Sequence, residues 1–134
     1  MISVQEIGGL KIACWVNQKG FDAAKKTLVF IHGSGGDHTA WVHQYGQLKN
    51  DFNIAAINLP GHGQSEGRGE QEVALYVEWV EKILDQWAIH KSVLIGHSIG
   101  AAICLAFALK YGDRLSGIVP VGGGATMPVN QAIL

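Results

Sequence analysis

The stretch SVLIGHSIGAAICLAFALKY, residues 92–111, decides the fold of this chain. It opens with Ser92–Gly96, an apolar run typical of a buried strand. It closes with Ile99–Tyr111, a longer run that is apolar nearly all round and predicts a buried helix. The segment between them, GHSIG at residues 96–100, fits the pattern G-x-S-x-G at a strand-to-helix turn. This order predicts a sharp turn that holds the Ser98 hydroxyl clear of the sheet.

The rest of the chain alternates short apolar runs with helical patterns, which is typical of an α/β fold with a mostly parallel sheet and flanking helices. The other predicted elements are a hairpin of Val4–Ile7 and Leu10–Val16, strands Thr27–Ile31, Phe52–Leu59 and Leu115–Val121, and helices Ala40–Leu48 and Glu70–Trp87. We expect Glu70 and Glu72 in the first turn of their helix, where the helix dipole favours anions. The final strand is apolar on both faces, as in the interior of a sheet.

Glycine is the outstanding feature of the composition, with 18 among 134 residues, about twice the usual share of about 7%. Ten of them lie at or just beyond the carboxyl end of a predicted strand: Gly33, Gly35, Gly36, Gly61, Gly63, Gly96, Gly100, Gly122, Gly123 and Gly124. In a parallel sheet these ends share one edge, and open α/β sheets bind their ligands there. The glycines therefore predict a site at this edge.

The net charge argues against two classes of binding partner. A net charge of −1 and a pI near 6.6 give no electrostatic case for nucleic acid or an anionic membrane.

Residues 92–109 carry no formal charge, but glycines, His97 and Ser98 interrupt them, so we expect no membrane span. We expect Cys14 and Cys104 to be buried thiols. With no signal peptide predicted at the N-terminus, we expect a cytoplasmic location.

A second glycine-rich motif, HGSGG at residues 32–36, follows the predicted strand Thr27–Ile31. Such a turn lets the backbone approach the serine closely, and we assign the Ser34 N–H as one donor to an oxyanion. The Ile99 N–H, at the start of the next helix, is the other donor. A phosphate-binding loop is the alternative, but the Walker lysine and the dinucleotide fingerprint are missing. No metal-ligand spacing occurs among the histidines.

Three motifs together resemble the α/β-hydrolase superfamily. HGSGG resembles its oxyanion loop, NLPGHGQS at residues 58–65 its D-x-P-G-H-G-x-S turn, and GHSIG its nucleophile elbow. The resemblance spans about residues 5–130, includes Trp41, and departs at Asn58, where many members carry Asp. It implies a serine hydrolase that acts on a small, ester-like acyl substrate without a cofactor or metal ion. The residues it implies are Ser98 as the nucleophile, Ser34 and Ile99 as oxyanion donors, and His32, Gly33, Gly96, His97 and Gly100 as support of the site edge.

The family's triad runs Ser, then Asp or Glu, then His along the chain. No histidine follows His97, and Asp113 is the only acidic residue after Ser98, placed at the opposite sheet edge. We therefore expect residues 1–134 to be the N-terminal part of a single hydrolase core domain, with about six of the family's eight strands. Alone it would be weak or inactive, unless another histidine substitutes. The nearest are His32, His38, His62 and His97, with His38 free in a loop beside Asp37.

Two other interpretations of the chain stay open. The first is a fragment that needs a complementary chain, or that self-associates, at the edge of the strand 115–121. The second is a non-catalytic binding protein with the same fold.

Overall fold

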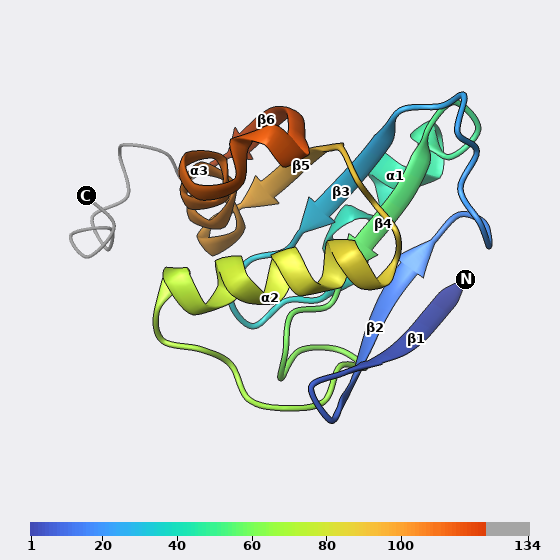
Figure 1. Cartoon of the computed structure of the whole chain (residues 1–134). Helices are drawn as coiled ribbons and strands as arrows, with labels where there is room; N and C mark the ends of the chain where they lie inside the picture. The colour runs from blue at the N-terminus through green and yellow to red at the C-terminus, as the bar shows by residue number, and fades with distance from the viewer. Residues whose placement is uncertain (123–134) are drawn as a thin grey trace.

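The structure, a computed structural model, describes residues 1–122 and consists of one sheet with helices on both faces (Figure 1). Six strands lie in the order β1-β2-β4-β3-β5-β6. Their bounds are β1 Ile2–Ile7, β2 Leu10–Val16, β3 Thr27–Ile31, β4 Asn53–Ile57, β5 Ser92–His97 and β6 Leu115–Val121. Strands β1 and β2 are antiparallel to each other, β2 is antiparallel to β4, and the other pairs are parallel. The predicted fold class is confirmed.

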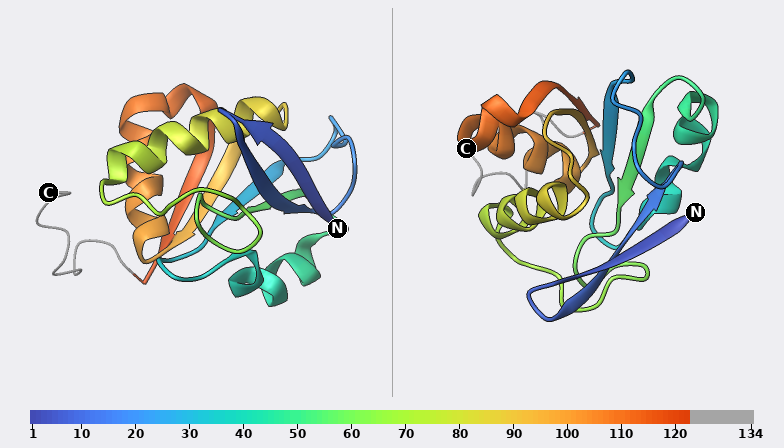
Figure 2. Two further views of the ribbon diagram at one scale, coloured as in Figure 1. Left: turned by 90° about the horizontal axis from the view of Figure 1, so that it is seen from below. Right: turned by 45° about the vertical axis from the view of Figure 1, so that its right-hand side comes forward.

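The helices follow the strands in alternation. They are η1 His38–Trp41, α1 Val42–Leu48, α2 Val73–Gln86, α3 Ile99–Tyr111 and η2 Gly112–Arg114. Helix α1 packs on one face of the sheet, where Trp41 and Tyr45 join Phe30 and Ile54 in a buried cluster. Helices α2 and α3 cover the other face over a larger cluster, as both views in Figure 2 show. One face is thus covered by a single short helix and the other by two long ones.

Parallel pairing places the carboxyl ends of β3, β4 and β5 at one sheet edge. Ile31 lies opposite Ile57 in β4 and opposite Gly96 in β5, so the three chain segments that follow start side by side. Those segments are the ones with the three motifs. The predicted clustering of glycine at this edge is confirmed for residues up to Gly122, and Gly123 and Gly124 lie outside the described residues.

Three predicted helices differ from the observed ones. The helix predicted over Ala40–Leu48 is α-helical only from Val42, and its first two residues lie in η1. Helix α2 begins at Val73, so Glu70 and Glu72 do not lie in its first turn. Glu70 is held outside the helix because its N–H donates to the Tyr76 hydroxyl (2.8 Å) and its carboxylate accepts from Trp79 Nε1 (3.1 Å). The prediction that α3 is buried is confirmed for one face of the helix and wrong for the other. Leu109 is 91% exposed, because the described elements pack against only part of this helix.

Both thiols are buried, as predicted, and desolvation raises the pKa of Cys14 and of Cys104. In the described part of the chain, no helix is both long enough and apolar enough to cross a membrane.

Candidate active site

Ser98 lies in the turn between β5 and α3 with a backbone conformation that L-residues rarely adopt. Its φ is 61° and its ψ is −117°, which costs about 1–3 kcal/mol. The glycines on either side make this turn sterically possible, as predicted. A Cβ at Gly96 would collide with the Gly100 carbonyl, and a Cβ at Gly100 would collide with the Ile31 carbonyl of β3. The strain and the two close approaches hold Ser98 at the sheet edge.

The helix that follows directs its amino end at the same place. The Ser98 carbonyl accepts from the amides of Ala101 (2.9 Å) and Ala102 (3.3 Å), which closes the first turn of α3. The Ile99 amide precedes this bonded turn, and among residues 1–122 it donates no hydrogen bond. A free first-turn amide at a helix amino terminus attracts negative charge. Ile99 is thus available as an anion donor beside Ser98.

The loop after β3 forms a tight turn against Ser98. The Gly36 amide donates to the Gly33 carbonyl (3.1 Å), and Gly35, with φ of 77°, supplies the positive φ that a type II turn needs. A Cβ at Gly33 would lie only 3.3 Å from the Ser98 Cβ. Within the described residues the Ser34 amide has no acceptor. The structure thus brings Gly33, Ser34 and Ser98 together at one edge.

His32 lies directly below this loop and is fully buried. Its Nε2 accepts from the Leu59 amide (3.1 Å), so the proton of the neutral ring must be on Nδ1, which donates to the Gly33 carbonyl (2.7 Å). Burial lowers the pKa of His32, and the bond to Gly33 offsets part of that effect. Both ring nitrogens are occupied, so His32 is not the substitute base considered above.

Asn58, the departure from the superfamily pattern, is buried directly after β4 and joins two distant segments. Its amide nitrogen donates to the Ala13 carbonyl (3.0 Å), and its oxygen accepts from the His38 amide (2.9 Å). The same oxygen lies 2.9 Å from His38 Nδ1. The expectation that His38 is free in a loop is therefore wrong, because Asn58 holds both its backbone and its ring. The motif alone carries no signal of this tie between residues 20 positions apart.

The remaining histidines near the edge make different contacts. The His62 ring lies 4.9 Å from the His32 ring, and its Nδ1 is 3.1 Å from the Pro60 carbonyl. The exposed His97 ring lies between the loops at Gly33 and Gly122. In the part of the chain that the structure describes, no side chain is hydrogen-bonded to the Ser98 hydroxyl. Asp113 lies in η2, before β6 and at the opposite sheet edge, as predicted.

No group of three His, Cys, Asp or Glu side chains within residues 1–122 is placed to hold a metal ion. A surface hollow of about 230 Å³ lies between β1, β2 and the end of α2, next to Ser3, Val16, Phe21 and Trp87. It is at the sheet edge opposite Ser98, because β2 ends where β4 begins. None of Ser34, Ser98 and Ile99 lines this hollow.

Comparison with known proteins identifies the family. The sequence pattern described as alpha/beta hydrolase fold matches residues 26–133. This chain belongs to the alpha/beta hydrolase fold family. The resemblance drawn from the three motifs is thereby confirmed.

Several alpha/beta hydrolases are similar to this chain. A 2-hydroxy-6-oxononadienedioate/2-hydroxy-6-oxononatrienedioate hydrolase of Paraburkholderia phymatum is 30% identical over 128 residues, across 90% of this chain and 43% of that protein. Putative esterase/lipase 2 of Mycoplasma pneumoniae is 31% identical over 110 residues, across 80% and 39%. The crystal structure of a putative lipase from Acinetobacter baumannii has a TM-score of 0.80 at 21% identity, over 88% of this chain and 40% of that one. The chain spans less than half the length of these relatives.

Proposed function

We propose that this polypeptide supplies the nucleophile and the oxyanion donors of a serine hydrolase that cleaves an ester-like acyl substrate. Ser98 is the nucleophile, and the Ser34 and Ile99 amides bind the oxyanion. The observation that carries the proposal is the strained backbone of Ser98, with φ of 61°, between a strand and a helix. Such strain persists only where the surroundings enforce it, and it gathers at active sites.

In this reaction the Ser98 Oγ attacks the acyl carbonyl, and its proton passes to a general base. The tetrahedral oxyanion accepts hydrogen bonds from the two amides, each worth about 10²–10³ in rate. Collapse expels the alcohol with the proton from the base, and water then hydrolyses the acyl-serine. His32, Gly33, Gly96, His97 and Gly100 shape the edge on which these groups sit. No cofactor takes part in these steps.

The general base is assigned to a histidine outside these 134 residues. Every histidine of the chain precedes Ser98, whereas the family order puts the base after the nucleophile. Loss of the base costs about 10⁶-fold in a comparable enzyme, while the oxyanion hole and binding retain about 10³–10⁴-fold over water. We therefore expect the chain alone to be a weak acyl acceptor.

The names of the relatives support hydrolysis or acyl transfer as the reaction class. Two of them are named as a hydrolase and as a putative esterase/lipase, and another as a 1-acylglycerol-3-phosphate O-acyltransferase of Mus musculus.

The test is site-resolved acetylation by p-nitrophenyl acetate, an activated ester whose leaving group needs no proton. Mass spectrometry follows Ser98 and the exposed Ser116 of β6 in the same chain, so Ser116 is an internal control. We expect Ser98 to react at least about 10²-fold faster, because one oxyanion donor alone is worth that much. Ser98→Ala should abolish the fast acetylation, and Ser116→Ala should leave it unchanged.

A non-catalytic binding protein is the second candidate, favoured by the Ser98 hydroxyl having no hydrogen-bonded partner within residues 1–122. Equal acetylation of Ser98 and Ser116 would support this candidate and contradict the hydrolase.

A further inference from the structure

We propose that His32 is a positioning residue that orients the peptide unit whose N–H, that of Ser34, binds the oxyanion. The inference rests on the proposed function, because it assigns a role within the same site. His32 would act through the Gly33 carbonyl and would never touch the substrate.

The geometry follows from the planarity of the peptide bond. The Gly33 carbonyl and the Ser34 N–H belong to one peptide unit, and no peptide among the described residues is cis. In a trans unit the C=O and the N–H point in opposite directions. Two donors, His32 Nδ1 at 2.7 Å and the Gly36 amide at 3.1 Å, hold the carbonyl. The Ser34 N–H is therefore directed away from the buried ring.

The same bonds make the Ser34 N–H a stronger donor. A carbonyl that accepts hydrogen bonds polarises its peptide unit, so the amide proton of that unit carries more positive charge. The Gly36 bond belongs to the turn itself, whereas the His32 bond comes from the strand end beneath it. His32 thus links the rigid sheet to the donor that the reaction needs.

The surroundings fix the ring in this role. His32 is fully buried, and the Leu59 amide occupies its Nε2 at 3.1 Å. The titratable groups that face it are His62, whose ring is 4.9 Å away, and the more distant Asp37 and His38. A flip of the ring or an exchange of its tautomer would leave the Leu59 N–H without its acceptor and would remove one of the two donors to the Gly33 carbonyl. The loss at Leu59 is the costlier one, because that hydrogen bond is buried and its N–H has no other acceptor among the described residues.

The orientation of the Gly33–Ser34 peptide unit affects the reaction because this unit lies next to Ser98. A Cβ on Gly33 would lie 3.3 Å from the Ser98 Cβ and 3.4 Å from the His97 carbonyl, so the peptide unit lies against the nucleophile turn. A displacement of about 1 Å in such a site costs about 10²-fold in rate. Loss of the bond from His32 Nδ1 should therefore affect the reaction and not only the stability.

Two isosteric variants separate the two ring nitrogens. In His32→Asn the side-chain NH₂ takes the place of Nδ1 and can still donate to Gly33, while the acceptor for Leu59 is lost. In His32→Gln the side-chain oxygen takes the place of Nε2 and keeps the Leu59 bond, while the donor to Gly33 is lost. His32→Asn loses the buried bond to Leu59 and His32→Gln the partly buried bond to Gly33, so we expect His32→Asn to lose more stability than His32→Gln.

We expect His32→Asn to slow the acetylation of Ser98, relative to Ser116, by no more than about threefold, and His32→Gln by about 10²-fold. The ¹⁵N and ¹H shifts of the Ser34 amide should move in His32→Gln and stay near the wild-type values in His32→Asn. Equal losses in the two variants would overturn the proposal, because a merely structural histidine would not distinguish them.

NMR of the wild-type chain tests the proposal even if a variant does not fold. Long-range ¹H–¹⁵N spectra should show His32 neutral at pH 7 with its proton on Nδ1. A charged ring, or a proton on Nε2, would overturn the inference. If Ser98 reacts no faster than Ser116, the proposed function fails, but the tautomer and the Ser34 shifts still decide whether His32 orients the peptide unit.

Discussion

At the scale of the residue, Gly100 shows how closely β3 and the nucleophile turn approach each other. A Cβ there would meet the Ile31 carbonyl and lie 3.0 Å from the His32 carbonyl. Both contacts are to backbone atoms, which cannot rotate away as a side chain can. The second glycine of the G-x-S-x-G motif is therefore required by the packing of the start of α3 against β3 as well as by the turn at Ser98.

We predict that Gly100→Ala lowers the free energy of unfolding by about 3 kcal/mol, since overpacking against fixed atoms costs about 1–3 kcal/mol. Urea unfolding followed by circular dichroism measures the change. Gly46→Ala is the matched control, because Gly46 lies in α1 with open space around its Cβ. Gly46→Ala should raise the free energy of unfolding by about 1 kcal/mol, because alanine favours the helix more than glycine does. A Gly100→Ala variant as stable as the wild type would contradict the observed approach.

The lowered pKa of His32 predicts how the free energy of unfolding depends on pH. Burial lowers its pKa in the folded chain below the ordinary 6.5, so the unfolded state binds the proton more readily. The stabilisation is full above pH 6.5 and is lost as the pH falls through the folded pKa. We predict that urea midpoints decline on acidification below about pH 6.5, and that the decline is shallower in His32→Asn. Identical declines would show that His32 does not contribute.

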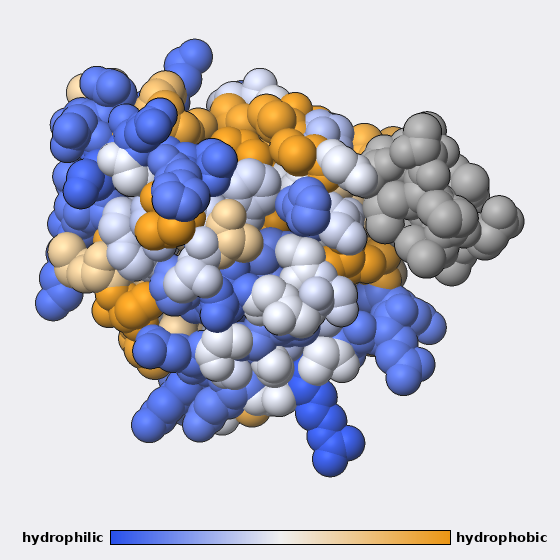
Figure 3. Space-filling view, turned by 180° about the vertical axis from the view of Figure 1, so that it is seen from behind, coloured by the Kyte–Doolittle hydropathy of each residue, from blue (hydrophilic) through white to orange (hydrophobic). Residues whose placement is uncertain are grey.

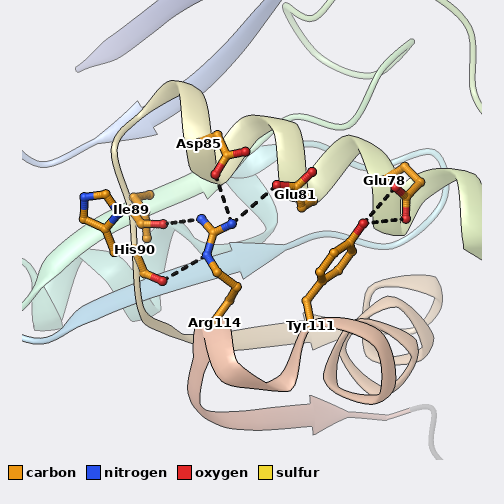
Figure 4. A network of polar contacts seen from close by, with 7 residues as sticks. All are labelled: Glu78, Glu81, Asp85, Ile89, His90, Tyr111 and Arg114. Carbon is orange, nitrogen blue, oxygen red and sulfur yellow. Dashed lines mark hydrogen bonds and ion pairs between the residues drawn. The ribbon is translucent and has the colours of Figure 1, made fainter.

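At the scale of the element, Arg114 joins the η2 turn to helix α2 and to the segment after it (Figure 4). Its guanidinium donates to the carbonyls of Ile89 (2.8 Å) and His90 (3.0 Å). It also pairs with Asp85 at 3.0 Å and Glu81 at 3.4 Å. These contacts fix where β6 begins relative to β5.

We predict that Arg114→Lys lowers the free energy of unfolding by about 2 kcal/mol, because a lysine cannot donate to two carbonyls and two carboxylates at once. Lys110→Ala serves as the control. It removes an ion pair to Glu78 in which both side chains are well exposed, at 59% and 38%, so unfolding should be unchanged. Equal effects of the two substitutions would mean that Arg114 is an ordinary surface charge.

The elements also show what local sequence can predict. The hairpin, the strands and α3 were predictable because their apolar periods are local. The start of α2 was not, since it depends on Tyr76 and Trp79 holding Glu70 outside the helix. In the site, glycine spacing predicted the turn at Ser98. The ties of His32 to Leu59 and of Asn58 to His38 join segments 27 and 20 residues apart and have no local pattern.

At the scale of the whole molecule, the described sheet ends at β6 with apolar side chains in solvent. Val119 lies beside Ile95 in the register, on the face opposite α2 and α3, and α1 does not reach it. Val119 and Val121 are 45% and 39% exposed. Figure 3, which views the molecule from behind, shows apolar surface in several separate places on that face. Exposed apolar side chains on the outermost strand of a sheet favour contact with another chain.

In the sheet that the structure describes, the outer edge of β6 offers few backbone groups for pairing. The Ser98 amide donates to the Val121 carbonyl, so the polar groups of Val121 face β5. Those of Pro120 and Ile118 then face outward, because strand residues alternate in direction. Pro120 has no N–H to donate, so another strand cannot form a complete series of backbone hydrogen bonds along this edge. Association at this edge would depend on apolar side chains more than on strand pairing.

We predict that the 134-residue chain self-associates through this surface, so that light scattering after size exclusion gives a mass above 14.4 kDa that rises with concentration. Val119→Lys places a charge in the middle of the apolar contact and should return the mass to the monomer value. Leu75→Lys is the control, because Leu75 is equally exposed, at 45%, but lies on α2. A wild-type chain that stays monomeric at every concentration would mean that these side chains do not form a contact between copies.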